Sequence, residues 1–109
     1  MVNYRRLEAS EIERLQAQMC TASDWNGIEV AEGFSADHVS NVRFSGKIRL
    51  GVFRKEFSLA GGIRKHSGIY HATLHNVTVG DDCLIENICN YIANYTIGRG
   101  AFIENVDII

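Results

Sequence analysis

The chain has 109 residues, of which 46% are hydrophobic and 22% charged, and its formal net charge is −2. These values are ordinary for one small globular domain and give no reason to expect nucleic acid or an anionic membrane as a partner. No apolar run approaches the roughly 20 residues that span a bilayer. No secretory signal is visible at the N-terminus, so we expect a cytoplasmic protein.

The segment 1–27 is predicted to be helical and to cap the rest of the domain. Ser10 and Glu13 fit a capping box, and Leu15 and Met19 follow at helical spacing. From position 28 onward the pattern changes to short β-rich pieces, at 39–44 and 47–53, that alternate with glycine-bearing turns.

The three cysteines do not suggest a disulfide framework or a metal site. Cys20, Cys83 and Cys89 are odd in number and none belongs to a CxxC pair. We therefore expect small buried thiols and no metal.

A regular repeat dominates the C-terminal third. The triplet Ile85-Glu86-Asn87 returns as Ile103-Glu104-Asn105, and within it an aromatic or aliphatic residue recurs at every sixth position: Val79, Ile85, Tyr91, Ile97, Ile103 and Ile109. Because residues two apart in a strand share a face, this set and the residues two before each should point inward. Each unit of this repeat then forms a short strand and a turn. Three units make a coil of about 18 residues, which stacks on the next at about 4.8 Å.

The runs Val79–Leu84 and Ile97–Phe102 resemble the hexapeptide repeat of left-handed parallel β-helix proteins, the acyltransferase-like superfamily. The resemblance implies a mainly β fold with a few coils over positions 28–109, regular from about 70 and cut short at 109. More narrowly, Gly62–Tyr70, Asn90–Tyr95 and Phe102–Asp107 are similar to the N-terminal part of a longer, uncharacterised bacterial hexapeptide-repeat family.

His75 is the first catalytic candidate. The segment Leu74–Gly80 resembles the one that carries the catalytic histidine of lipid A pathway acyltransferases of this fold. The resemblance implies that His75 is a general base that takes a proton from a sugar hydroxyl or amine as it attacks an acyl thioester. The alternative is a solvated histidine in a turn.

Glu86 and Glu104 are the next catalytic candidates. One coil apart, their backbones should lie about 4.8 Å from each other, which is unfavourable for like charges. Either the side chains splay into water, or a cation lies between them: Arg99, a metal, or a lysine or arginine of a partner.

Four further residues are candidates for binding substrate. Arg64 and Lys65 lie in a glycine-rich loop that could hold the phosphate of a nucleotide-sugar or coenzyme A, although a solvated loop is the simpler interpretation. Asn76 and Asn94 are separated by the same interval as the repeated triplet and lie in predicted turns. Their amides could bond to each other in a structural ladder or contact a substrate.

Two groups of residues concern assembly and the interior. Leu84 and Phe102 should point outward from one face and form the interface of a homo-oligomer, with a trimer favoured or a continuing chain as the alternative. A second column, His71, Cys89 and Asp107, should lie inside.

Two functions follow from these features. The first is a transferase-like module for acyl transfer to, or binding of, a sugar or nucleotide-sugar. No cofactor is evident from the sequence, and acyl-CoA or a nucleotide-sugar could serve this function. The second is a non-catalytic β-helix segment for assembly or ligand binding. Whether the chain is an enzyme stays open.

Overall fold

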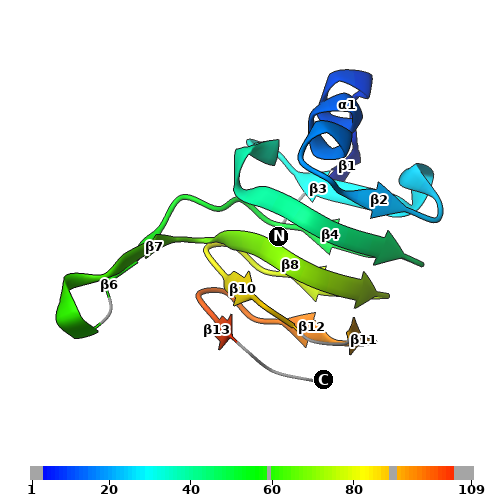
Figure 1. The fold of residues 1–109 in the computed structure, drawn as a ribbon. Helices are drawn as coiled ribbons and strands as arrows, with labels where there is room; N and C mark the ends of the chain where they lie inside the picture. Colours follow the sequence, from blue (N-terminus) through cyan, green and yellow to red (C-terminus); the bar gives the residue numbers. More distant parts are fainter. Residues whose placement is uncertain (1–3, 59, 89–90, 105–109) are drawn as a thin grey trace.

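The computed structural model describes residues 4–58, 60–88 and 91–104. The described chain is mainly β with one α-helix, which confirms the predicted fold class at this level. Figure 1 shows the helix α1 at one end of a stack of short strands, and a narrow hairpin that projects from the side of this stack.

Helix α1 covers Ala9–Ala17 and is shorter than the predicted helical segment. Its capping box consists of Glu8 and Glu11: the Glu8 side chain accepts a backbone N–H, and Glu11 Oε1 accepts the N–H of Glu8 at 2.9 Å. The predicted box of Ser10 and Glu13 is therefore wrong, because both residues lie inside the helix.

The other described residues of the segment 1–27 form no α-helix. It contains β1 (Tyr4–Arg6), β2 (Thr21–Ala22) and the 3₁₀ turn η1 (Trp25–Gly27). Leu15 is fully buried, but Met19 lies beyond the helix with a φ of 67° and is 73% exposed.

Two larger sheets and one hairpin hold the strands. The five-stranded sheet joins, in order, β1, β3 (Ile28–Ala31), β5 (Ile48–Leu50), β9 (Thr78–Val79) and β12 (Thr96–Ile97). The six-stranded sheet consists of β13 (Phe102–Glu104), β10 (Leu84–Glu86), β8 (Gly68–His75), β4 (Val39–Ser45) and β2, with β11 (Ile92–Ala93) also paired to β8. The 3₁₀ turn η2 (Ala36–His38) precedes β4.

The strand pairs show where the predicted repeat holds and where it fails. Three parallel pairs have the spacing that the repeated triplet predicted: Leu74 with Ile92, Thr78 with Thr96, and Leu84 with Phe102. Earlier pairs have other spacings: Ile28 with Ile48, and Val39 with Ile69. β1 and β3 are antiparallel, as are the two strands of the hairpin. The sheets are thus mixed, and no regular β-helix is identified in the described chain.

Several turns between the strands contain residues in the left-handed region. Positive φ occurs where the repeat predicted turns: Asp82, Asn87, Asn94 and Gly100. Asparagine, aspartate and glycine tolerate this region better than other residues do.

The core lies between the sheets and includes many of the residues predicted to point inward. Among them, Val77, Val79, Cys83, Ile85 and Ile97 are buried. Tyr91 and Tyr95 were predicted to point inward as well, but they are 42% and 50% exposed. Their rings are too large for an interior lined by valine, cysteine and isoleucine.

Two of the cysteines meet the expectation of buried thiols. Cys20 and Cys83 are free and buried, and burial raises the pKa of both. Cys89 lies outside the described residues.

The projecting hairpin, which we call the arm, consists of the described residues between 55 and 67. It contains β6 (Glu56–Ser58), the turn η3 (Ala60–Gly62) and β7 (Arg64–His66). Its base is closed by two bonds, from Ser67 N–H to the Lys55 carbonyl at 2.7 Å and from Lys55 N–H to Ser67 Oγ at 3.0 Å. Because the arm is inserted between β5 and β8, the pairs that bracket it are more widely spaced in sequence than later pairs.

Candidate functional site

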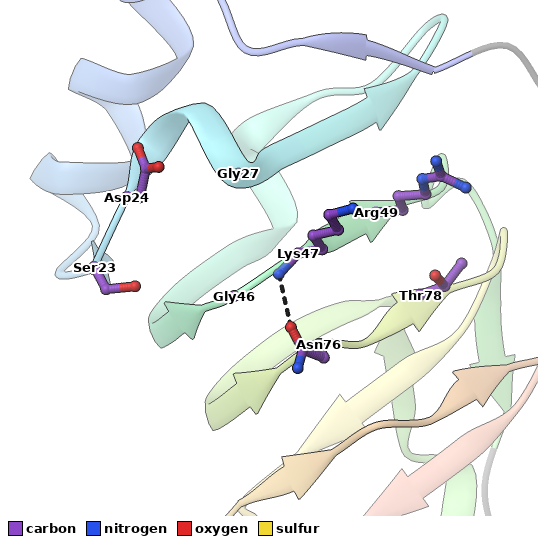
Figure 2. Close-up of a pocket in the computed structure, with 8 residues that line it drawn as sticks. All are labelled: Ser23, Asp24, Gly27, Gly46, Lys47, Arg49, Asn76 and Thr78. Atoms are coloured by element: carbon purple, nitrogen blue, oxygen red, sulfur yellow. Dashed lines mark hydrogen bonds between the residues drawn. The ribbon is translucent and has the colours of Figure 1, made fainter.

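Asn76 is the centre of a hydrogen-bond network at the turn between β8 and β9. Its Oδ1 accepts the backbone N–H of Lys47 at 2.9 Å, as Figure 2 shows. Since a backbone N–H can only donate, this bond determines the orientation of the amide. Its Nδ2 therefore donates to Asn94 Oδ1 at 3.2 Å and lies 3.1 Å from His75 Nε2. The asparagine ladder predicted from the sequence is thus bonded at this position.

The same network determines the tautomer of His75. Because Asn76 Nδ2 is a donor, His75 Nε2 must accept and cannot carry the proton of the neutral ring. The proton is then on Nδ1, which donates to Ser45 Oγ at 2.8 Å. Ser45 in turn donates to the carbonyl of Leu74 over a long 3.5 Å contact.

Ser45 and His75 are as close as a nucleophile and its general base, but their hydrogen bond runs in the opposite direction. A base must present a lone pair to the hydroxyl proton, whereas His75 presents an N–H to Ser45. The lone pair on Nε2 is already occupied by Asn76. As arranged here, the three side chains join adjacent strands and turns. A catalytic role of His75 stays a prediction.

Beside this network lies a hollow, which we call the corner groove. It has a volume of about 860 Å³. Three separate segments line it, as Figure 2 shows. They contribute Ser23, Asp24 and Gly27, then Gly46, Lys47 and Arg49, and finally Asn76 and Thr78.

Two glycines make the corner groove possible. A Cβ on Gly27 would lie 2.7 Å from the carbonyl oxygen of Gly46. Gly46 has a φ of 70°, and a Cβ there would collide with Asn76 Oδ1. The two turns can approach this closely only because neither residue has a side chain.

Glu86 and Glu104 are held together by Lys65, a residue whose role here the sequence did not predict. Lys65 Nζ lies 2.5 Å from Glu86 Oε1 and 2.7 Å from Glu104 Oε2. The hydrogen bond from Lys65 lowers the pKa of Glu104, and the bonds to Glu104 and Glu86 raise the pKa of Lys65. The carboxylates do not splay into water. Arg99, which was named as a bridging cation, lies 4.0 Å from Asp82 instead.

The predicted phosphate loop does not gather positive charge. Lys65 faces two carboxylates, so the local charge of this group is negative. Arg64 is exposed at the end of the arm, and its side chain has no hydrogen bond or ion pair within the described chain. Among the four predicted substrate contacts, only Asn76 lines the corner groove, and the pair Arg64 and Lys65 lies apart from it.

The two predicted interface residues are placed differently from each other. Phe102 is 40% exposed, and its ring packs edge-on against Phe57 of the arm with centroids 5.3 Å apart. Leu84 is fully buried within the chain, so the expected pair of exposed apolar side chains is absent. An oligomer contact through Phe102 stays a prediction.

His71 was expected to lie inside the fold, but its side chain is exposed. It lies within β8 with a φ of 57°, and its Nδ1 lies 2.8 Å from Asn41 Nδ2. The other members of its predicted column, Cys89 and Asp107, lie outside the described residues.

Sequence reasoning missed Lys47 and the stacked pair of His38 and His66. The two histidine rings are 3.6 Å apart and join the arm to the turn before β4. Burial, and then the charge of His66, lowers the pKa of His38. No local motif marks these residues, because their contacts join segments that are distant in the sequence.

A family model described as Domain of unknown function (DUF4954) matches residues 4–109. The chain belongs to this family. It is also similar to an uncharacterised protein of Treponema pallidum (strain Nichols), with 29% identity over 104 residues, which are 95% of this chain and 14% of that protein. The chain therefore spans about one seventh of that relative. No solved structure matches it.

This membership corrects the resemblance drawn from the repeat. The assignment to the hexapeptide-repeat β-helix superfamily is wrong, since the matches are to DUF4954 and to the treponemal protein. The mixed parallel and antiparallel sheets agree with this correction. The recurrence of apolar residues at every sixth position reflects short strands and turns of similar length. By itself this recurrence does not specify a family.

Two other classes of feature are absent from the described part of this DUF4954 chain. Within residues 4–58, 60–88 and 91–104, no helix is long and apolar enough to cross a membrane. In the same described parts, no three histidine, cysteine or acidic side chains are grouped so that they could hold a metal ion.

Proposed function

We propose that this DUF4954 chain is a non-catalytic scaffold segment whose polar side chains tie neighbouring strands together. One observation carries the proposal: each candidate catalytic side chain is bonded to side chains of neighbouring strands or turns. His75 is bonded to Ser45 and Asn76, and Lys65 joins Glu86 to Glu104.

The chemistry of these groups also favours a structural role. A general base needs a lone pair within reach of the substrate, and that of His75 is occupied. A carboxylate whose pKa is lowered by a bound ammonium is a weaker base, which applies to Glu104. Acyl transfer to a sugar stays a prediction from the sequence, and the geometry gives it less support than the scaffold role.

The length of the treponemal relative agrees with a role of this chain as a supporting segment of a longer protein. The chain matches only 14% of the treponemal protein. A module with cross-strand bonds suits a segment of a longer protein, because each bond limits how neighbouring strands slide. The activity of any such whole protein is itself a proposal.

Paired assays of turnover and stability test the scaffold role. We expect no thiol release from acyl-CoA in the presence of nucleotide-sugars, and a lower melting temperature in Asn76→Ala and Lys65→Met. Arg64→Gln is the matched control, because the Arg64 side chain is exposed and has no bonded partner in the described chain; its melting temperature should not change. Turnover by the wild type that disappears in a folded His75→Ala variant would refute the proposal.

A further inference from the structure

The corner groove continues into a second hollow, of about 240 Å³, that brings in another cation. Gly27, Lys47 and Arg49 line both hollows, and Arg6 lines the second one. The two hollows form one depression beside β3 and β5, and cationic side chains enter it from β1, from β5 and from the turn before β5.

The charges in this depression are unequal. Lys47 and Arg6 are exposed and have no ion pair with any described residue. Arg49 Nε lies 3.1 Å from Glu29 Oε1, so this pair is close to neutral. The remaining anion, Asp24, accepts the N–H of Asn26 at 3.0 Å, and in Figure 2 its carboxylate points away from Lys47. A local excess of positive charge is notable in a chain whose net charge is −2.

Neutral donors lie beside these cations. The hydroxyls of Ser23 and Thr78 line the corner groove, and neither is bonded to another described residue. Gly27 and Gly46 also line the corner groove, and they add no side chain to it. Phosphate oxygens accept several hydrogen bonds at once, and lysine and arginine are the side chains that bind them most often.

We propose that this depression, formed by the corner groove and the second hollow, binds a phosphate-bearing small molecule. Its charged contacts are Lys47, which lines both hollows, and Arg6, which lines the second one. Ser23 and Thr78 donate hydrogen bonds to the same ligand. The proposal does not depend on the scaffold role, because the Lys47 side chain takes no part in the network around Asn76. The site also differs from the loop of Arg64 and Lys65 that the sequence suggested.

Binding is measured by ¹H–¹⁵N NMR titration of the wild type with inorganic phosphate and with pyrophosphate, at constant ionic strength adjusted with NaCl. Saturable shifts are expected at the amides of Gly27, Gly46, Lys47 and Thr78. Lys47→Gln should weaken pyrophosphate binding about tenfold, as the loss of one charge-assisted hydrogen bond implies. Arg6→Gln should weaken it as well.

The matched control is Arg64→Gln, which removes one exposed positive charge outside the groove. Unchanged binding in this variant, together with weaker binding in Lys47→Gln, supports the site. Equal weakening in both variants would mean attraction by net charge alone and would overturn it. The proposal also fails if millimolar pyrophosphate gives no saturable shift, or if the shifts centre on the arm. Because Lys47 is exposed, unchanged thermal unfolding of Lys47→Gln verifies that the variant is folded.

Discussion

Replacing Gly46 by alanine tests whether the network around Asn76 holds the strands together. Gly46 has a φ of 70°, and a Cβ there would collide with Asn76 Oδ1 and lie 3.3 Å from His75 Cε1. Alanine in the left-handed region costs about 1–2 kcal/mol. Displacing Asn76 also removes its bond from Lys47 N–H, a net loss of about 0.5–1.5 kcal/mol. The free energy of unfolding should therefore fall by about 1.5–3.5 kcal/mol.

Gly61→Ala separates the backbone cost from the collision. Gly61 has a similar φ of 79°, but a Cβ there would meet nothing within 4 Å. This variant should lose only about 1–2 kcal/mol. At about 4 °C per kcal/mol for a domain of this size, the melting temperature should fall by roughly 6–14 °C for Gly46→Ala and roughly 4–8 °C for Gly61→Ala. Calorimetry measures both, and equal losses would refute the reasoning.

A double-mutant cycle with Asn76→Ala then tests the cause. Without the Asn76 side chain the collision disappears, so Gly46→Ala should cost only its backbone term in that background. The coupling energy should reach about 1 kcal/mol, within the range for residues in contact. If the two substitutions were additive, the collision with Asn76 would not be the source of the loss.

Three other predictions concern the arm and the buried residues around it. The pKa of Glu104 is lowered, chiefly by its hydrogen bond with Lys65. The Glu104 carboxylate therefore contributes stability that is present above its unfolded pKa of 4.5 and is lost as the pH falls. In melting curves taken between about pH 3 and pH 7, Lys65→Met should show a smaller loss of stability at low pH. The pKa of His38 is lowered by burial and by the charge of His66, so folding is less favourable as the pH falls below 6.5; in His66→Asn an NMR titration should show a higher pKa for His38. Leu84→Ala should cost about 2–4 kcal/mol in urea denaturation because Leu84 is fully buried, and a loss below about 1 kcal/mol would contradict its packing.

Local chemistry explains which parts of the fold could be predicted from the sequence. The turn positions of Asn87, Asn94 and Gly100 were predictable, because positive φ depends on the residue itself. The strand β4 was predictable from its own pattern as well. The prediction that Tyr91 and Tyr95 point inward was wrong, because the six-residue spacing does not show whether a side chain fits the interior.

Contacts between distant segments explain what could not be predicted. The sequence showed that Glu86 and Glu104 require a cation if they stay together, but it could not identify Lys65. That lysine lies near the base of the arm, two residues before Ser67. Its strand partner Phe57 packs against Phe102 of β13. The arm is itself an insertion between β5 and β8, which interrupts the repeat before position 70.

For the same reason, the corner groove could not be predicted, and the two proposed roles, scaffold and ligand binding, meet there in one residue. The backbone N–H of Lys47 bonds to Asn76 and joins two turns, whereas its ammonium is left without an ion pair among the described residues. One residue therefore serves stability through its main chain and is available to a ligand through its side chain. Since glutamine retains the main-chain bond, Lys47→Gln should reduce pyrophosphate binding and leave the melting temperature unchanged. Asn76→Ala should lower the melting temperature, so the two proposed roles can fail independently.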